Sequence, residues 1–453
     1  MYPSLALLFC CGFILWLFRQ DFRWRKIGSW ALLVPGIWFA IQGSRQVSYW
    51  FADSGGGAEG HPINTLTYGL LIASAVVVLF SRRISWGSVV GNNKSLFLIY
   101  AFFALGAFLS ESPLLSLKRL FKDFGCVLMA LVFLTQTDPA SAIRTVFVRL
   151  SYLIFPLSVV FIKYFPEIGR GASRAGDSIF TGVTTQKNEL GEIVFALSLF
   201  ILWDLFEIRK REGIPGKKIQ VLIRLGLLLI AIWLLNTCAS KTSMLCLGLG
   251  SVALLGTPRL MRKSYGKTLL STCLIAGVLM VALDKSIGLS AKVAVALGKD
   301  PSLTGRTAIW QLVREQGTDP FIGEGYYLFW DSPKGKAVQD NFIPVTTAHN
   351  GYLEMYMDGG TVVIVLLGLF LVCSGKRVLD RLSEESPLGA IGLAIFITAL
   401  VFNLSESSFL RLTPLWGCLL VVVIRIPRQG SEVPWTTSQG RISGSDKWAD
   451  QAV

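Results

Sequence analysis

Long apolar runs separated by short polar segments are the dominant pattern along this chain. The runs are roughly 16 to 22 residues long, close to the ~20 residues that a helix needs to cross the hydrocarbon core of a bilayer. Within lipid, the backbone must satisfy its hydrogen bonds inside each segment, which favours helices. The pattern therefore predicts an all-α polytopic membrane protein with roughly 12 to 13 transmembrane helices.

The apolar runs also give the positions of the expected spans. These lie at residues 3–18, 28–42, 65–81, 96–110, 115–135, 147–164, 189–206, 219–236, 242–257, 267–283, 353–374, 388–404 and 409–426. We therefore expect transmembrane helices 1 to 10 within residues 1–283, a large extracytoplasmic loop at 284–352, and C-terminal transmembrane helices within 353–426. Residues 427–453 are polar and rich in Gly and Ser, which predicts a disordered cytoplasmic tail.

Composition agrees with a membrane protein. Hydrophobic residues make up 52% of the chain and charged residues 16%, whereas soluble domains average about 25% charged residues. The first apolar run is followed by its basic residues and lacks a small-residue cleavage site, so we expect a retained span and not a signal peptide. Nearly all of the eight cysteines lie in apolar runs, and their spacing suggests neither a zinc site nor a disulfide framework.

The net charge of +14 would suit a nucleic-acid-binding protein, but the placement of the charge argues against nucleic acid as a partner. Basic residues gather in every second polar segment, which is the positive-inside pattern of membrane proteins. The basic groups are Arg19, Arg23, Arg25 and Lys26; Arg82 and Arg83; Arg209, Lys210, Arg211, Lys217 and Lys218; Arg259, Arg262 and Lys263; and Lys376, Arg377 and Arg381. This alternation predicts an outside N-terminus and an inside C-terminus.

The long loop at 284–352 contains a segment with helical periodicity, "SLTGRTAIWQLVREQ". Ile309, Leu312 and Val313 would share one face of an amphipathic helix, and Thr304 is a plausible N-cap. A loop of this length without the composition of a disordered segment is usually functional.

Three side chains at the expected outside ends could carry chemistry. His349 is one of only two histidines and lies where the long loop becomes a span. A helix starting near Asn350 would point free N–H groups and its positive end at this place, which attracts anions and favours a neutral imidazole able to act as a base. Arg306 suits bidentate phosphate contact, and Lys241 supplies a second cation. The alternatives are a helix cap, a solvated face and a snorkelling lysine, respectively.

Further polar residues at outside ends are candidates for substrate binding. They are Lys187, Asn188, Arg119 and Glu406, together with Asn350. Charge placed inside a span, as at Arg119, is costly and often functional. The alternative for each is an interfacial anchor or a cap. His61, in "EGHPIN", is expected to be an exposed loop residue.

Several catalytic motifs are absent from the sequence. It has no D-x-D pair, no H-E-x-x-H, no phosphate-binding G-x-x-x-x-G-K-[ST] and no G-x-S-x-G. The sequence therefore predicts no metal and no cofactor, and any enzyme here would need a substrate that arrives already activated.

The order of the motifs resembles the O-antigen ligase and polymerase superfamily. The resemblance rests on "TTQKNELG", "SKTSML", "GRTAIW", "DPFIGEGYYLFW", "HNGYLEMYMDGG" and "NLSESSF". It covers residues from about 110 to 416, and "SESPLLSLKR" is similar to the exopolysaccharide-polymerase branch.

This resemblance implies a metal-independent, GT-C-type glycosyltransferase in the bacterial inner membrane, with its active site facing the periplasm. The substrate would be a glycan linked to undecaprenyl pyrophosphate, and a flippase and a chain-length regulator are possible partners. His349 and Arg306 would match the family's catalytic histidine and loop arginine, and His349 would either take the acceptor proton or hold the phosphate. Lys241 would take the place of a second arginine, a departure that keeps the charge but loses the planar fork.

Three activities remain open from the sequence. One is a polymerase of repeat units and another is a ligase that moves finished glycan from the same carrier to lipid A core. The third is a transporter of lipid-linked sugar. Transporters usually place polar groups at the bilayer midplane, whereas the distinctive polar groups here gather at the outside ends.

Overall fold

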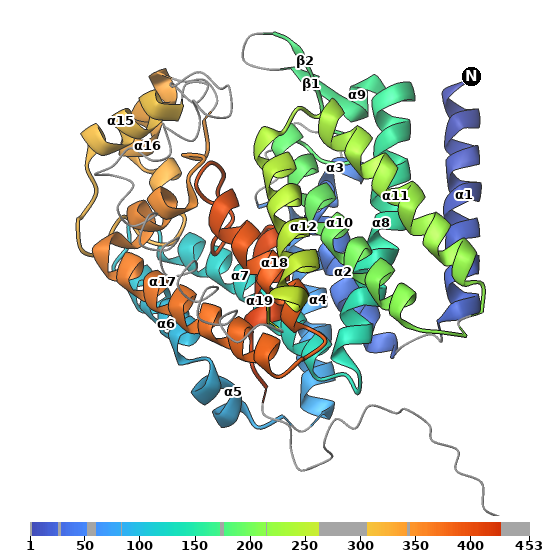
Figure 1. The fold of residues 1–453 in the computed structure, drawn as a ribbon. Helices are drawn as coiled ribbons and strands as arrows, with labels where there is room; N and C mark the ends of the chain where they lie inside the picture. The colour runs from blue at the N-terminus through green and yellow to red at the C-terminus, as the bar shows by residue number, and fades with distance from the viewer. Residues whose placement is uncertain are drawn as a thin grey trace, which may run out of the picture.

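The computed structural model describes residues 2–25, 29–51, 60–82, 84–172, 176–213, 215–261, 306–341 and 345–426. Within these ranges the chain is helical apart from connecting loops and one small hairpin (Figure 1). The expectation of an all-α polytopic membrane protein is therefore confirmed.

The elements follow one another in simple order along the chain. The first part contains α1 (Pro3–Trp24), η1 (Trp30–Leu32), α2 (Leu33–Gln42), α3 (Ser48–Phe51), α4 (Pro62–Ser81), α5 (Trp86–Asn92), α6 (Lys94–Ala107), α7 (Pro113–Leu134), α8 (Pro139–Tyr164) and α9 (Pro166–Gly169). The second part contains β1 (Arg170–Ala172), β2 (Ser178–Phe180), α10 (Lys187–Lys210), α11 (Lys217–Thr237), α12 (Lys241–Met261), α15 (Arg306–Gln316), η3 (Phe329–Asp331), α16 (Pro333–Asn341), α17 (Gly351–Ser383), α18 (Gly389–Phe402) and α19 (Pro414–Val423). The strands β1 and β2 pair antiparallel, with Gly171 opposite Ile179.

Five of the described helices are long and apolar enough to cross a membrane: α1, α4, α8, α11 and α17. The pair α5 and α6, which is bent by 97°, also passes as one broken span, and four apolar helices are shorter. Helices occupy twelve of the thirteen predicted spans. The remaining one, at 267–283, lies outside the described residues, as does the proposed cap Thr304.

The last predicted span, 409–426, is longer than the helix that forms there. Pro414 occupies the first turn of α19, and the Thr413 side chain accepts a hydrogen bond from the Trp416 N–H. Proline fits the first turn because its missing N–H has no partner to lose there. Residues 403–413 consequently form a loop, and Arg411 lies in this loop and not inside a span.

Two apolar cores hold the chain together. The larger core lies between the membrane helices, where α10 packs against α8, α11 and α12, and where Phe147 stacks on Phe200 with ring centroids 4.1 Å apart. The smaller core joins α15, α16 and the segment 345–348, and we call this unit the cap. Ile309 and Val313 are buried in the cap and Leu312 packs against it, which confirms the predicted apolar face of α15.

The helix α17 is interrupted between its first two turns and the rest of its length. Gly359 and Gly360 have non-helical dihedral angles, and the φ of Gly360 is +59°. The loop before α16 packs into this break: the Glu324 N–H donates to the Met357 carbonyl at 2.8 Å, and the Thr361 N–H donates to the Pro320 carbonyl at 2.8 Å. The segments "DPFIGEGYY" and "MDGG" therefore pack against each other in the folded chain.

The helices alternate in direction, so their ends gather at two opposite faces. The starts of α7, α10 and α17 lie at one end, together with the cap. The start of α8 and the end of α10 lie at the other, where Arg144 pairs with Asp204. In Figure 1 the start of α1 lies toward the same end as the β1–β2 hairpin and the cap.

Candidate active site

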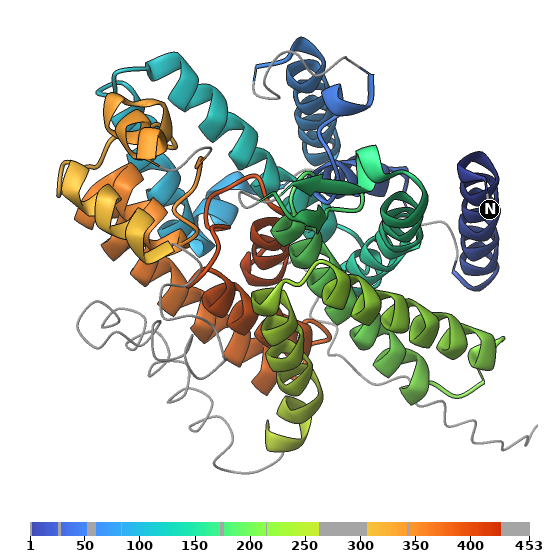
Figure 2. The same ribbon diagram turned by 90° about the horizontal axis from the view of Figure 1, so that it is seen from above.

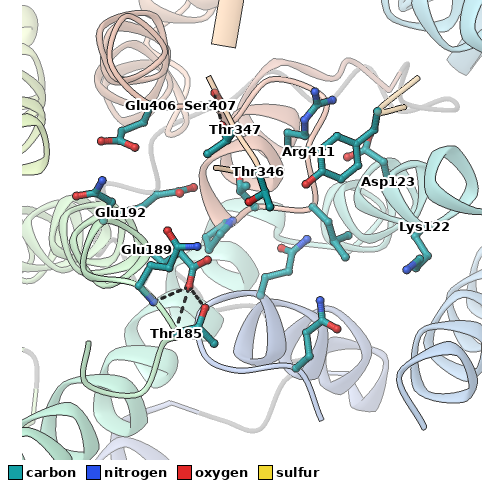
Figure 3. Close-up of a pocket in the computed structure, with 18 of the residues that line it drawn as sticks. Lys122, Asp123, Thr185, Glu189, Glu192, Thr346, Thr347, Glu406, Ser407 and Arg411 are labelled. Carbon is teal, nitrogen blue, oxygen red and sulfur yellow. Dashed lines mark hydrogen bonds between the residues drawn. The ribbon is translucent and has the colours of Figure 1, made fainter. Parts of the chain in front are cut away.

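A cavity of about 390 Å³ opens between the helix ends that carry the predicted site residues. It is bounded by the starts of α7 and α10, the segment 346–349 and the loop 406–414 (Figure 3). Its wall mixes carboxylates, amides, hydroxyls and aromatic rings, and Glu192, Thr347 and Arg411 all line it. A cavity with this mixture suits a hydroxyl-rich substrate better than an apolar one.

Glu406 lines this cavity together with His349 and also binds Arg306, which is not among the lining residues. The Nδ1 of His349 lies 3.0 Å from Oε2 of Glu406, and Nη2 of Arg306 donates to Oε1 at 2.6 Å. Arg306 Nη1 also donates to the carbonyl of Ser405. Each carboxylate oxygen therefore binds one of two residues, His349 and Arg306, that the sequence predicts to carry chemistry.

The Glu406 carboxyl group is held in its ionised form. Burial would raise its pKa, but the Arg306 guanidinium and the hydrogen bond to His349 outweigh burial and lower the pKa below its ordinary value. An ionised carboxylate only accepts hydrogen bonds, so Nδ1 of His349 must be the donor. In the neutral imidazole this leaves Nε2 with its lone pair available.

The backbone at His349 is held in a conformation that few side chains adopt. Its φ is +51°, in the left-handed region where histidine is tolerated better than bulky residues. The preceding residue is fixed in the cap: the Trp310 indole donates to the Ala348 carbonyl at 2.7 Å, and the Ala348 N–H donates to Glu354 at 2.5 Å. The position of the imidazole is therefore set by the packing of the backbone around it.

The position of Glu406 depends on a buried asparagine at the end of α18. The Asn403 side chain accepts hydrogen bonds from the N–H groups of Ser408 and Phe409 at 2.8 and 3.1 Å. The Gly351 N–H donates to the carbonyls of Asn403 and Glu406, both at 2.9 Å. A Cβ at Gly351 would lie 1.9 Å from Asn403 Oδ1, so only glycine permits this approach.

Comparison with known proteins finds two similarities. A family model described as O-antigen ligase matches residues 225–368, a segment that contains Lys241, Arg306 and His349. Over this segment the chain is similar to the O-antigen ligase family. It is also 27% identical over 346 residues to a protein of Rhizobium meliloti (strain 1021) named "Exopolysaccharide production protein ExoQ", covering 70% of this chain and 74% of the relative. The predicted resemblance is thereby confirmed, and the chain is a membrane enzyme related to polysaccharide assembly.

The start of α17 differs from the prediction. Asn350 is the N-cap, and its Oδ1 accepts hydrogen bonds from the N–H groups of Tyr352 and Leu353, both at 3.1 Å. Since Gly351 donates to the loop at 403–406, the first three N–H groups of the helix all have partners. The expectation of free N–H groups that attract an anion is therefore wrong, and Asn350 does not line the cavity.

Lys241 and Lys187 lie beside the cavity and do not line it. Lys241 is the exposed first residue of α12, and its neighbour Thr242 shares a 2.7 Å hydrogen bond with Ser405, whose carbonyl also accepts from Arg306. Lys187 is the first residue of α10. Both residues thus lie at the border of the candidate site and not in its lining.

Asn188 and Arg119 do line the cavity. Arg119 is buried and donates to the Tyr327 carbonyl and to Asp331 at 2.6 Å, and its guanidinium lies 4.9 Å from the Tyr327 ring centroid. Arg119 therefore ties the start of α7 to the segment that leads into the cap. Its charge is already paired, so it can orient a bound glycan more readily than it can supply a free cation.

Arg411 is a candidate site residue that the sequence patterns did not single out. It lines the cavity and pairs with Glu354 at 3.1 Å and Asp358 at 2.8 Å, while its guanidinium lies 4.2 Å from the Tyr327 ring centroid. Glu354 in turn accepts from Thr347 at 2.9 Å, two residues before His349. Arg411 falls within the predicted span 409–426. Placing a charged side chain inside an apolar span is energetically costly, and this is the feature of the sequence that indicates a function for it.

His61 is a helix cap and not a free loop residue. Its Nδ1 accepts a hydrogen bond from the Ile63 N–H at 3.2 Å, at the start of α4. Among the residues described, no group of three or more His, Cys, Asp or Glu side chains is arranged to hold a metal ion.

Proposed function

We propose that this protein is a glycosyltransferase that polymerises oligosaccharide repeat units carried on undecaprenyl pyrophosphate, on the periplasmic side of the membrane. The family match and the exopolysaccharide relative support the class of substrate. The observation that carries the mechanism is the carboxylate of Glu406, which lines a polar cavity and binds both the imidazole of His349 and the guanidinium of Arg306.

In the proposed reaction, a hydroxyl oxygen of the acceptor sugar attacks the anomeric carbon of the lipid-linked glycan. The new carbon–oxygen bond forms while the bond from that carbon to the pyrophosphate breaks, and the pyrophosphate leaves with the electron pair. The acceptor proton passes to Nε2 of His349. The resulting imidazolium is stabilised by Glu406, which already accepts from Nδ1 at 3.0 Å.

Arg306 has a second role in this proposal. Negative charge develops on the departing pyrophosphate, and a preorganised cation stabilises such charge most where water is excluded. Arg306 is largely buried and shares the Glu406 carboxylate with His349, so in this proposal it meets the pyrophosphate while the base meets the acceptor. Lys241, at the border of the site, would add charge without bidentate geometry.

The decisive experiment separates the imidazole base from the shape of the site. His349→Asn keeps a residue that tolerates the left-handed backbone and an amide able to donate to Glu406, but it removes the base. We expect polymer formation to fall by about 10²- to 10⁴-fold, the usual contribution of a general base. The readout is glycan length on a gel, with membrane protein levels measured alongside.

Two further variants complete this test. Glu406→Gln should lower activity by roughly 100-fold, because it removes the charge that orients His349 and Arg306. His61→Asn is the control, since asparagine also caps helices well, and it should be near wild type. Full-length polymer from well-expressed His349→Asn protein would contradict the proposed mechanism. If long chains accumulate on the lipid carrier when the gene is deleted, the protein is a ligase; if single repeat units remain, it is a polymerase.

The proposal also assigns the reaction no metal. The purified protein should therefore extend lipid-linked glycan equally well in the presence of a chelator. Activity that disappears with the chelator and returns with magnesium or manganese would show that charge on the pyrophosphate is neutralised by a divalent ion and not by Arg306 alone.

A further inference from the structure

A second cavity, of about 480 Å³, lies at the opposite end of the helices from the candidate active site. It is lined by Arg25 at the end of α1, by Arg144 near the start of α8 and by Arg211 after the end of α10. Hydroxyl and amide groups of Ser141, Thr145 and Gln220 share this wall. These are the donor groups that proteins use to bind phosphate oxygens.

Three carboxylates, Asp138, Asp204 and Glu207, line this cavity beside its three arginines, and Arg144 lies 3.8 Å from Glu207. Arginine is in excess once the ion pairs behind the wall are included, where Arg149 and Arg224 are added and, in the described part of the chain, Asp21 is the one further carboxylate. Asp204 forms ion pairs with three arginines: Arg25 at 2.6 Å, Arg224 at 2.9 Å and Arg144 at 3.2 Å. Asp21 forms an ion pair with Arg149 at 2.7 Å and lies 3.6 Å from Arg25. Both aspartates are almost fully buried, so each carries more than one cation without help from water.

Arg211 adds to this excess at the mouth of the cavity. It is exposed, and within the described part of the chain no carboxylate lies within ion-pairing distance of it. An anion that enters here would therefore meet charge that the protein itself leaves uncompensated.

An apolar groove of about 340 Å³ continues from this cavity. Ser29 and Leu32 line both, so the two spaces are contiguous. The groove runs between α1, α2 and α8; its apolar lining includes Phe18, Phe22, Leu33, Ile37, Leu150 and Leu153. Arg149 also lines the groove, and its Nη2 has no hydrogen-bond partner among the described residues.

The position of α1 explains why this groove exists. Figure 2 shows α1 standing apart from the other helices, and only 28% of its apolar window is buried by the protein. The exposed sides of Phe22 and Leu33 face a space that no described helix fills.

We propose that an anionic phospholipid occupies the two spaces together, with its phosphate among Arg25, Arg144 and Arg211 and an acyl chain in the groove between α1 and α8. Basic pockets between membrane helices are typical sites for anionic headgroups. A soluble phosphate would leave the groove empty, and a neutral lipid would leave the arginine charge unmatched. The bound lipid fastens α1 to the helix bundle. This site is independent of the reaction proposed above.

The test uses the purified full-length protein and measures its thermal stability in detergent with added lipid. Phosphatidylglycerol should raise the unfolding temperature, while phosphatidylcholine and inorganic phosphate should have little effect. Arg211→Gln removes a cation from the cavity mouth without breaking an ion pair within the described chain. Gly36→Leu fills the groove, because the nearest atom to a Cβ there is Val146 Cγ1 at 3.8 Å.

Each variant should bind phosphatidylglycerol about tenfold more weakly, since each removes one favourable contact. Without added lipid both should unfold near the wild-type temperature, because Arg211 is exposed and leucine is a better helix former than glycine. Arg209→Gln is the matched control: it is the same substitution two residues away, outside the cavity lining, and should bind like wild type.

Three results would overturn the proposal. Equal stabilisation by phosphatidylcholine would mean that the groove accepts any lipid and that the arginines play no part. Equal stabilisation by inorganic phosphate would mean an ion site without a lipid. Unchanged binding of phosphatidylglycerol by both Arg211→Gln and Gly36→Leu would place the lipid elsewhere on the protein.

Discussion

His349 shows how much a single side chain depends on its neighbours. The imidazole was recognisable in the sequence because histidine is rare in this chain, but its partner Glu406 lies 57 residues away and Arg306 lies 100 residues from that carboxylate. Only the folded chain brings them together. The sequence suggested the three residues separately, and the structure adds that one carboxylate organises the other two.

The lowered pKa of Glu406 predicts how this arrangement responds to acid. A carboxyl group whose pKa falls on folding contributes stability above its ordinary value, about 4.5, and loses that contribution as the pH drops through the folded value. The difference in unfolding temperature between wild type and Glu406→Gln should therefore shrink as the pH falls below about 4.5. A difference that grows on acidification would mean that the carboxyl group is protonated in the folded protein.

At the scale of elements, the helices were predictable and their interruptions were not. Apolar periodicity located the spans and the buried face of α15, because burial in lipid and burial in a core follow the same spacing. The break in α17 and the short α19 depend on contacts with distant loops, which no local pattern contains. The pair of glycines in "MDGG" and the arginine in the last apolar run were the available signals.

The break in α17 gives a prediction about stability. At Gly360, φ is +59° and an added Cβ would lie 2.3 Å from the carbonyl carbon of Phe321. Gly360→Ala should therefore destabilise the protein by about 1 to 3 kcal/mol or more, seen as a lower unfolding temperature in detergent. The control is Gly368→Ala in the same helix, where a Cβ meets no atom within 4 Å. That change should be neutral or stabilising by up to ~1 kcal/mol.

For the whole molecule, the two ends of the helices have different chemistry. One end carries the polar cavity and the cap, and the other carries the arginine-rich cavity. Alternating basic segments made this division predictable, since they encode orientation. The two cavities could not be predicted, because each is built from four or more segments that are distant in the sequence.

Orientation can be measured directly. A reporter that is active only outside the cytoplasm should work when fused after Ser332, which lies at the start of α16 in the cap. The same reporter should be silent when fused after Lys217, at the start of α11 and at the opposite end. The reverse pattern would place the candidate active site in the cytoplasm and remove its access to an outer-leaflet donor.

Glu406 and the two residues that it binds belong to different parts of the fold, and this affects when the proposed site is complete. Arg306 begins the cap helix α15, and His349 follows the cap residue Ala348, whereas Glu406 belongs to the loop that follows α18. The boundary between the cap and the helix bundle therefore passes between Glu406 and the two residues that its carboxylate binds. Separating the two sides by a few ångströms would release the base and the cation in the same instant. In the proposed mechanism, such a separation would disable His349 and Arg306 together, so an open site would not transfer the activated sugar to water.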